Sequence, residues 1–243
     1  MTAVFPSASA LPENLLRFYV HYSAPMSREG ALDHVRLVGP DGPVAMPFAA
    51  PELSLWNGAR DRLTLILDPG RTKRGVGPHL EHGRVLSAGA EYTLEIDAGM
   101  LDGAGRRLAE PFAKRFRVVP ADHRSPEPVA WELLPPAGRR DTVTLRFAET
   151  VDHALLLSAL RVLGPTGEPL EGEVGIDDGE RSWSFRPAGD WPPGTCRLVV
   201  DAILEDPSGN RVGRSFESPA GRRVGGAAEP VVLEFDVETS ARG

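Results

Sequence analysis

The amino-acid sequence predicts an all-β fold of two tandem antiparallel β-sandwich domains. One observation is that apolar and polar residues alternate at a period of two, in runs of about four to seven residues that suit half-buried strands. A second is the supply of turn residues between these runs, with 26 glycines and 23 prolines. The third is an internal repeat: Arg36–Pro43 returns as Arg161–Glu168, and Asp97–Gly105 returns as Asp201–Gly209. Such a repeat predicts two domains of one type.

Strands are expected wherever the alternation is unbroken, because each such run places its apolar side chains on one face. The runs of the first copy are Leu16–Tyr22, Arg62–Leu67 and Tyr92–Ile96, and those of the second are Val143–Phe147, Trp183–Phe185, Cys196–Val200 and Val231–Val237. Short strands separated by turn residues are typical of sandwiches in which each domain closes its own core.

A helical pattern occurs only in Glu149–Leu163. Leu155, Leu156 and Leu160 suit one face of a helix, and Asp152 is a suitable N-cap. We expect a single helical turn after the second strand of each copy, which in the first copy falls within Ser23–Asp33.

The expected first domain covers residues 1–120, a proline-rich linker covers 121–128, and the second domain covers 129–243. The prolines of the linker favour an extended and semi-rigid connection. Ser218–Ala228, rich in glycine and arginine, is expected to be a flexible connection before the closing strand.

Composition excludes several classes of function. The net charge of −7 argues against nucleic acid or an anionic membrane surface as a partner, because both require a basic face. No apolar stretch approaches the ~20 residues of a membrane span. The single cysteine, Cys196, excludes an intrachain disulfide and a cysteine-based zinc cluster. Met1–Pro12 lacks the pattern of a signal peptide, so we expect either a cytoplasmic protein or one that has lost its export signal.

Two motifs recur in the order found in a known family. Phe18–Ser27 forms a strand that ends in Ser-Ala-Pro-Met, and Leu145–Asp152 is a looser version of it. Asp102–Gly105 and Asp206–Asn210 are aspartate turns that precede the closing strands. With these motifs the chain resembles tandem bacterial Ig-like domains of the surface-layer type. One departure is Arg106, which stands where the family has an asparagine.

The resemblance implies an Ig-like sandwich fold and an extracytoplasmic adhesion, spacer or binding module, in the periplasm or at the cell surface. The family offers no fixed catalytic residue, so the resemblance implies no enzyme activity and no cofactor.

Other candidate chemistry is weak in the sequence. Asp206–Asn210 has oxygen side chains at alternate positions, as calcium loops do, but an ordinary turn is favoured. His79 and His82 lack a third zinc ligand, so no metal is expected. His34 and His153 each follow an aspartate, and a surface or capping role is expected for them. Neither a Gly-x-Ser-x-Gly elbow nor a phosphate-binding loop occurs, and a hydrolase site at the domain junction is the least favoured alternative.

The clearest difference between the two copies is an insertion at residues 70–84. The first copy has 28 residues from Pro69 to Asp97, whereas the second has 14 from Pro187 to Asp201. Loops on a rigid sandwich often hold binding residues. The candidate ligand-binding residues of this loop are Arg71, Lys73, Arg74, His79, His82 and Arg84.

The loop has two interpretations. A basic loop in an acidic protein suits an anionic ligand, such as an acidic glycan, a phosphate or an acidic protein surface. The alternative is a structural loop whose arginines pair with nearby acids. The smaller insertion before it, with Leu53, Leu55 and Trp56, is expected to lie buried beneath it.

The functional prediction is a non-enzymatic Ig-like binding or structural module of the bacterial cell envelope, with a protein or a glycan as its partner. The second hypothesis is an accessory or sensor domain that binds an anionic ligand through residues 70–84. The sequence leaves the oligomeric state open.

Overall fold

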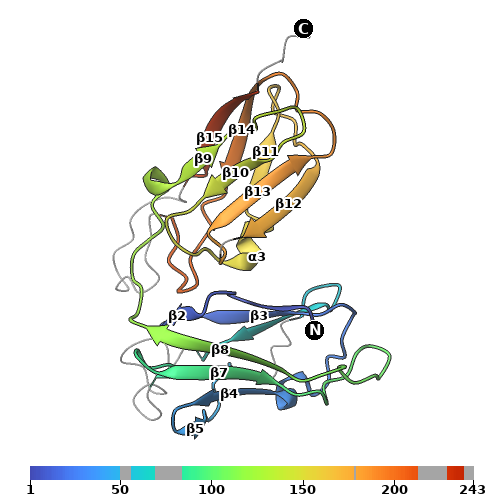
Figure 1. Ribbon diagram of the computed structural model, residues 1–243, viewed down its shortest axis with the longest axis vertical. Helices are drawn as coiled ribbons and strands as arrows, with labels where there is room; N and C mark the ends of the chain where they lie inside the picture. Colours follow the sequence, from blue (N-terminus) through green and yellow to red (C-terminus); the bar gives the residue numbers. More distant parts are fainter. Residues whose placement is uncertain (50–55, 69–83, 178, 213–228, 238–243) are drawn as a thin grey trace. The chain divides into compact units, whose positions relative to one another are not determined.

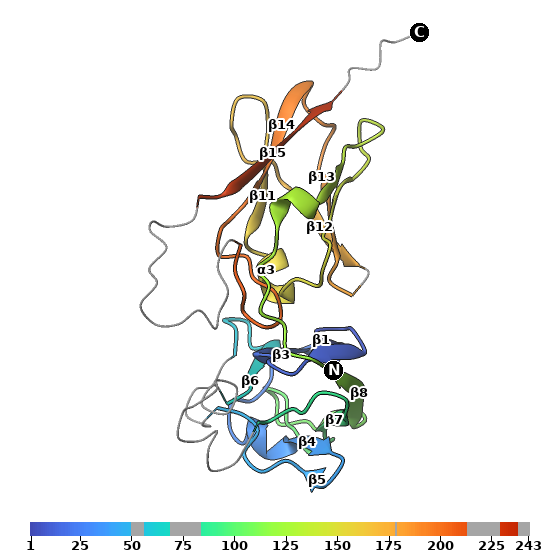
Figure 2. The same ribbon diagram turned by 90° about the vertical axis from the view of Figure 1, so that its left-hand side faces the viewer.

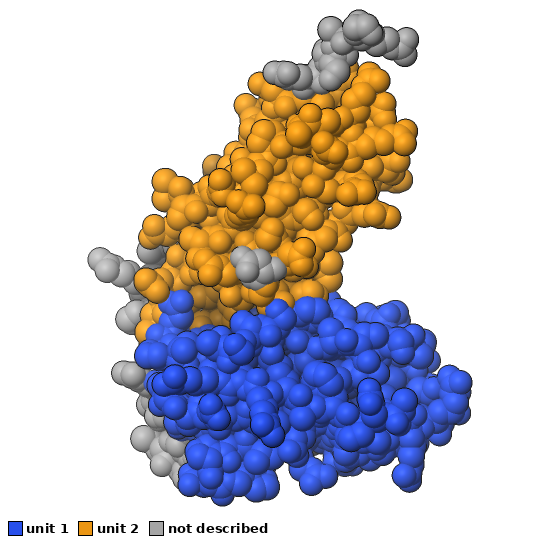
Figure 3. Space-filling view, in the orientation of Figure 1, with its two compact units in different colours: residues 1–122 blue, residues 123–243 orange. Residues whose placement is uncertain are grey.

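The computed structural model describes residues 1–49, 56–68, 84–177, 179–212 and 229–237. In these ranges the regular structure is nearly all β-strand, and the sheets are arranged as sandwiches, which confirms the predicted all-β class. The chain divides into two compact units, Met1–Asp122 and His123–Gly243, coloured separately in Figure 3. No helix of the described ranges is long and apolar enough to cross a bilayer.

Unit 1 contains two sheets (Figure 1). One has the order β1-β3-β6 and the other β2-β8-β7-β4-β5. Only the pairing of β2 with β8 is parallel among these strands. The strands are β1 (Ala3–Phe5), β2 (Ala10–Pro12), β3 (Arg17–His21), β4 (Val35–Gly39), β5 (Gly42–Pro43), β6 (Arg62–Ile66), β7 (Glu91–Ile96) and β8 (Phe112–Val119), with a 3-10 turn η1 (Ala31–His34) before β4.

Unit 2 also contains two sheets, which Figure 2 shows from the side. Their orders are β12-β13-β10-β9 and β11-β14-β15, and all their pairings are antiparallel. The elements are η2 (Pro128–Ala130), β9 (Glu132–Leu134), β10 (Val143–Arg146), α3 (His153–Leu156), β11 (Leu160–Leu163), β12 (Gly172–Asp177), β13 (Ser182–Pro187), β14 (Gly194–Val200) and β15 (Val231–Val237).

Strand register places the alternating apolar side chains in a separate core for each unit. In unit 1, Phe18 of β3 lies opposite Leu65 of β6, and both are buried. In unit 2, Leu145 of β10 lies opposite Trp183 of β13, and both are buried. Removing these apolar surfaces from water is the main stabilising contribution to each sandwich.

The helical pattern of Glu149–Leu163 gives only one turn of helix, α3. Asp152 caps it, since its Oδ1 accepts a hydrogen bond from the Leu155 N–H at 3.0 Å. Leu160 belongs to β11 instead, because strand pairing with Val200 of β14 takes precedence over helix propensity. The connection expected at Ser218–Ala228 lies outside the described residues.

Candidate functional site

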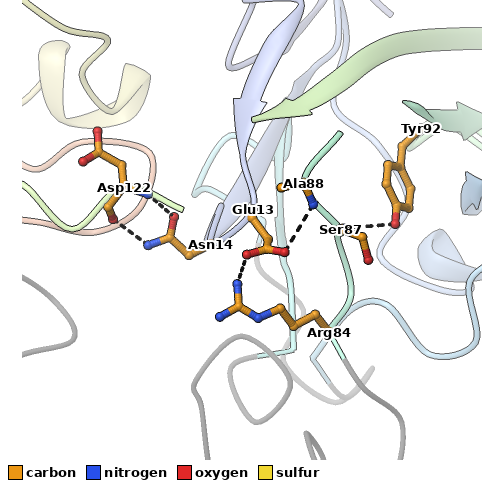
Figure 4. Close-up of polar contacts among 7 residues, drawn as sticks. All are labelled: Glu13, Asn14, Arg84, Ser87, Ala88, Tyr92 and Asp122. Carbon is orange, nitrogen blue, oxygen red and sulfur yellow. Dashed lines mark hydrogen bonds and ion pairs between the residues drawn. The ribbon is translucent and has the colours of Figure 1, made fainter. Parts of the chain in front are cut away.

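Of the six candidate ligand-binding residues of the loop, the structure describes one, Arg84. Its Nη1 donates a hydrogen bond to Oε2 of Glu13, which lies between β2 and β3 (Figure 4). The two side chains are only 14% and 18% exposed. The guanidinium of Arg84 is therefore part of an ion pair within unit 1. The other candidates, Arg71, Lys73, Arg74, His79 and His82, lie outside the described residues.

Residues 85–88, which follow Arg84, make further hydrogen bonds to the sandwich (Figure 4). The Ala88 N–H donates to Oε1 of Glu13 at 3.2 Å, and the Ser87 N–H donates to the hydroxyl of Tyr92 at 3.1 Å. Glu13 thus accepts from both Arg84 and Ala88. We define residues 84–88 as the loop base. For Arg84 this geometry matches the structural interpretation, in which an arginine of the loop pairs with a nearby acid.

Asn14, next to Glu13, holds another part of the same unit. Its Nδ2 donates to the carbonyl oxygen of Asp122 at 2.6 Å, and its Oδ1 accepts from the Asp122 N–H at 2.9 Å.

Of the smaller insertion, only Trp56 is described. It is partly buried, with its ring centroid 5.6 Å from that of Tyr22.

In the aspartate turn of unit 2, both oxygens of the carboxylate accept hydrogen bonds, one from the backbone and one from a side chain. Oδ1 of Asp206 accepts from the N–H groups of Ser208 and Asn210 at 2.8 and 2.9 Å, and Oδ2 accepts from Nδ2 of Asn210 at 2.8 Å. These contacts are those of a turn, as the sequence favoured.

The turn of unit 1 has the same geometry with a different donor. Oδ1 of Asp102 accepts from the N–H groups of Ala104 and Arg106, both at 2.9 Å, and Oδ2 accepts from Nε of Arg106 at 2.8 Å. Arg106 therefore replaces the asparagine without loss of the side-chain hydrogen bond. The bond from the Arg106 N–H, followed by that from Ala104, holds the pKa of Asp102 below its ordinary value.

An Asp–His pair in unit 1 joins residues far apart in the sequence. Nδ1 of His34 lies 2.8 Å from Oδ1 of Asp97, which also accepts from the Gly99 N–H at 2.7 Å. The Gly99 bond, followed by that with His34, lowers the pKa of Asp97. A Cβ on Gly99 would lie 2.8 Å from Cε1 of His34, so glycine is required for this close approach.

The corresponding place in unit 2 has no imidazole. The Asp201 N–H donates to the carbonyl of Ala159, as the Asp97 N–H does to that of His34. In the described part of the chain, Asp97 is the only side chain hydrogen-bonded to the His34 imidazole.

A surface or capping role was expected for the other histidine, and the surface part of that expectation is wrong. His153 is the first residue of α3 and is 8% exposed, and its Nδ1 lies 3.9 Å from Oε1 of Glu180.

Among the described residues, concave surfaces within a single unit include the following two. One, of 220 Å³, lies in unit 1 beside Arg36, Asp97 and Phe112. The other, of 920 Å³, lies in unit 2 along β12 and β13, where Glu171, Phe185 and other residues line it. Sequence reasoning did not identify either surface: the first joins segments far apart in the chain, and the second lies on β12, a strand that the alternation did not reveal.

No protein-family model matches this sequence, and no curated protein is similar to it. Among solved structures, the chain is similar to one chain of a crystal structure of a mouse coronavirus receptor-binding domain complexed with its murine receptor, with 13% identity and a TM-score of 0.19. That match covers 82% of this chain and 90% of the other. A TM-score this low supports no argument about fold or function.

Proposed function

We propose that the protein is a non-enzymatic binding or structural module of the bacterial cell envelope, built from two Ig-like domains. The observation that supports the proposal is how the chain uses its acidic side chains. Asp102, Asp206 and Asp97 each accept backbone N–H groups within a turn, so they stabilise the fold. Contacts of this kind are typical of residues with a structural role.

The strand arrangement supports the Ig-like part of the proposal. In chain order, β9, β10, β12 and β13 form one sheet and β11, β14 and β15 form the other. An Ig constant-type domain distributes its seven strands in the same way, with A, B, D and E in one sheet and C, F and G in the other. Domains of this type serve many unrelated functions, and binding residues usually lie on their loops and edges.

An accessory or sensor role with an anionic ligand is the second candidate. The loop base supports it, since Glu13 fixes the point at which residues 70–84 rejoin the sandwich. A rigid base reduces the entropy lost when a loop binds a ligand. With Arg84 engaged by Glu13, the proposed ligand-binding residues are Arg71, Lys73, Arg74, His79 and His82.

The test compares two triple variants of the full chain with the same change in charge. The loop variant replaces Arg71, Lys73 and Arg74 with alanine, and the control replaces the exposed Arg115, Arg117 and Arg161. Binding to an array of carboxylated glycans and to inorganic phosphate is measured for both. We expect only the loop variant to lose binding. Equal binding by the two variants would contradict the anionic-loop hypothesis.

The envelope assignment is tested by fractionating the cells that produce the protein naturally. We expect the chain in the periplasmic or surface fraction. Recovery with the cytoplasmic enzymes would contradict that assignment while leaving the loop experiment unaffected.

A further inference from the structure

Strand β12 has one edge that no described strand pairs with, which we call the free edge. It is the outermost strand of its sheet and pairs only with β13 among the described strands (Figure 1). Five of its six residues are exposed. A strand edge of this kind presents N–H and C=O groups that can pair with another extended chain.

The register shows which backbone groups face that edge. The Ala188 N–H donates to the carbonyl of Glu171 at 2.9 Å, so this pair is a hydrogen-bonded pair of the antiparallel ladder. Because such pairs recur at every second residue, Glu173, Gly175 and Asp177 also direct their backbone groups toward β13. Gly172, Val174 and Ile176 therefore direct theirs toward the free edge.

The glycines of the strand serve its pairing with β13. A Cβ on Gly172 would clash with the Arg186 carbonyl oxygen, and one on Gly175 would lie 2.7 Å from Oγ of Ser184. The 920 Å³ surface lies beside the first half of the strand, between Leu170 and Phe185. It offers room for a side chain of an incoming strand.

The negative charge along β12 indicates which kind of partner could pair with its free edge. Glu171, Glu173 and Asp177 lie at alternate positions, so they share the outer face of the sheet. If two copies paired through β12 about a twofold axis at residue 174, Glu171 would face Asp177 of the other copy. An axis at residue 175 would place Glu173 opposite Asp177 of the other copy. An axis at residue 173 would place Glu173 opposite Glu173 of the other copy. Like charges directly opposite one another destabilise a strand pair, so each of these registers is opposed.

We propose that β12 binds an extended segment of another protein by strand addition, and that this segment carries lysine or arginine at alternate positions, opposite Glu171, Glu173 and Asp177. Main-chain hydrogen bonds at Gly172, Val174 and Ile176 supply the pairing, and the alternate charges supply the specificity. The inference rests on the proposed binding function and names its partner.

The probe is a synthetic peptide of alternating lysine and valine with blocked ends, and its control is the alternating glutamate and valine peptide. Binding to the full chain is measured by calorimetry, with amide NMR shifts to locate it. We expect the lysine peptide to bind, to shift the amides of Gly172, Val174 and Ile176, and to bind more weakly as salt rises. The glutamate peptide should not bind.

Two variants separate edge pairing from general attraction between charges. Val174→Pro removes an N–H that faces the free edge and keeps the bonds to β13, so we expect binding at least about tenfold weaker. Val174→Thr retains the N–H and is expected to bind normally. The triple change of Glu171, Glu173 and Asp177 to lysine should reverse the preference, so that the glutamate peptide binds. It also serves as the test if Val174→Pro does not fold.

Some outcomes overturn the proposal. If Val174→Pro folds and binds the lysine peptide normally, the attraction is not strand addition. If neither peptide binds, the acids only protect the edge against aggregation. A dimer of the natural chain at neutral pH that is lost in Val174→Pro would make a second copy the occupant. Loss of glycan binding in the Arg71, Lys73 and Arg74 variant together with no peptide binding would retain the proposed function and reject β12 as its site.

Discussion

At the scale of single residues, aspartate side chains take the place of backbone acceptors in the turns that follow β7 and β14. Asp102 and Asp206 each collect two N–H groups on one oxygen and a side-chain donor on the other. They differ in their surroundings, because Asp206 is 2% exposed and its turn is buried, whereas the donor at Asp102 is the exposed Arg106.

Replacing Asp206 with alanine is expected to destabilise the protein by about 3 kcal/mol, because buried donors lose a charged acceptor. Asp102→Ala is the matched control, and its loss is expected to be clearly smaller because water can solvate the freed N–H groups. Urea unfolding of the full chain measures both. Equal losses of unfolding free energy in the two variants would show that burial of the turn does not determine how much its aspartate stabilises the protein.

Tyr22 gives an alkaline dependence of stability. Burial raises the pKa of its hydroxyl, which lies 3.0 Å from Sδ of Met100. A folded-state pKa above the unfolded value means that the stabilisation is complete below the unfolded pKa of about 10 and is lost as pH rises beyond it. We expect Tyr22→Phe to flatten the decline of unfolding free energy above that pH. A decline as steep as that of the natural chain would assign it to other groups.

At the scale of elements, the loop base shows how one connection between strands positions another. Glu13 follows β2, and residues 84–88 precede β7, yet two hydrogen bonds join them across 71 and 75 positions of sequence. The turn α3 shows the opposite case, in which a local cap, Asp152, determines where a short element begins.

The Glu13–Arg84 pair is expected to show a coupling free energy of about 1–2 kcal/mol in a double-mutant cycle, since both side chains are largely shielded from solvent. Glu132 and Arg146 form the control pair, at 3.4 Å with both side chains 59% exposed. That exposed pair should show a coupling of roughly 0–0.5 kcal/mol. Similar coupling in the two pairs would mean that the loop base is not rigidly held.

At the scale of the whole molecule, the period-two pattern was sufficient to predict the fold class, because alternation and turn residues are local properties. The strand β12 was missed, since its glycines and acids interrupt the alternation. The Asp97–His34 pair was missed too, because it joins residues 63 positions apart and only strand pairing brings them together. For the candidate loop, sequence showed its basic character but could not show that Glu13 would engage Arg84.

Cys196 provides a natural probe of unit 2. It is completely buried on β14, and burial, followed by the nearby Glu168 carboxylate, raises the pKa of its thiol. A thiol reagent should therefore react only when unit 2 opens. Leu145→Ala is expected to cost about 3 kcal/mol and to accelerate labelling about a hundredfold.

Leu65→Ala is the matched change in unit 1, whose core consists of its own residues. We expect it to leave the labelling of Cys196 unchanged. Acceleration by both variants would show that the two units open together.

The two aspartate turns have a consequence for finding relatives of this chain. In both, the glycine before the last donor has a positive φ, 78° at Gly105 and 81° at Gly209, while that donor is arginine in one case and asparagine in the other. The two turns thus share a side-chain donor that reaches the aspartate Oδ2, and not the identity of the amino acid that supplies it. A search pattern that requires aspartate and glycine and accepts any long or amide donor in the fifth place would recover sequences that an asparagine-specific pattern discards.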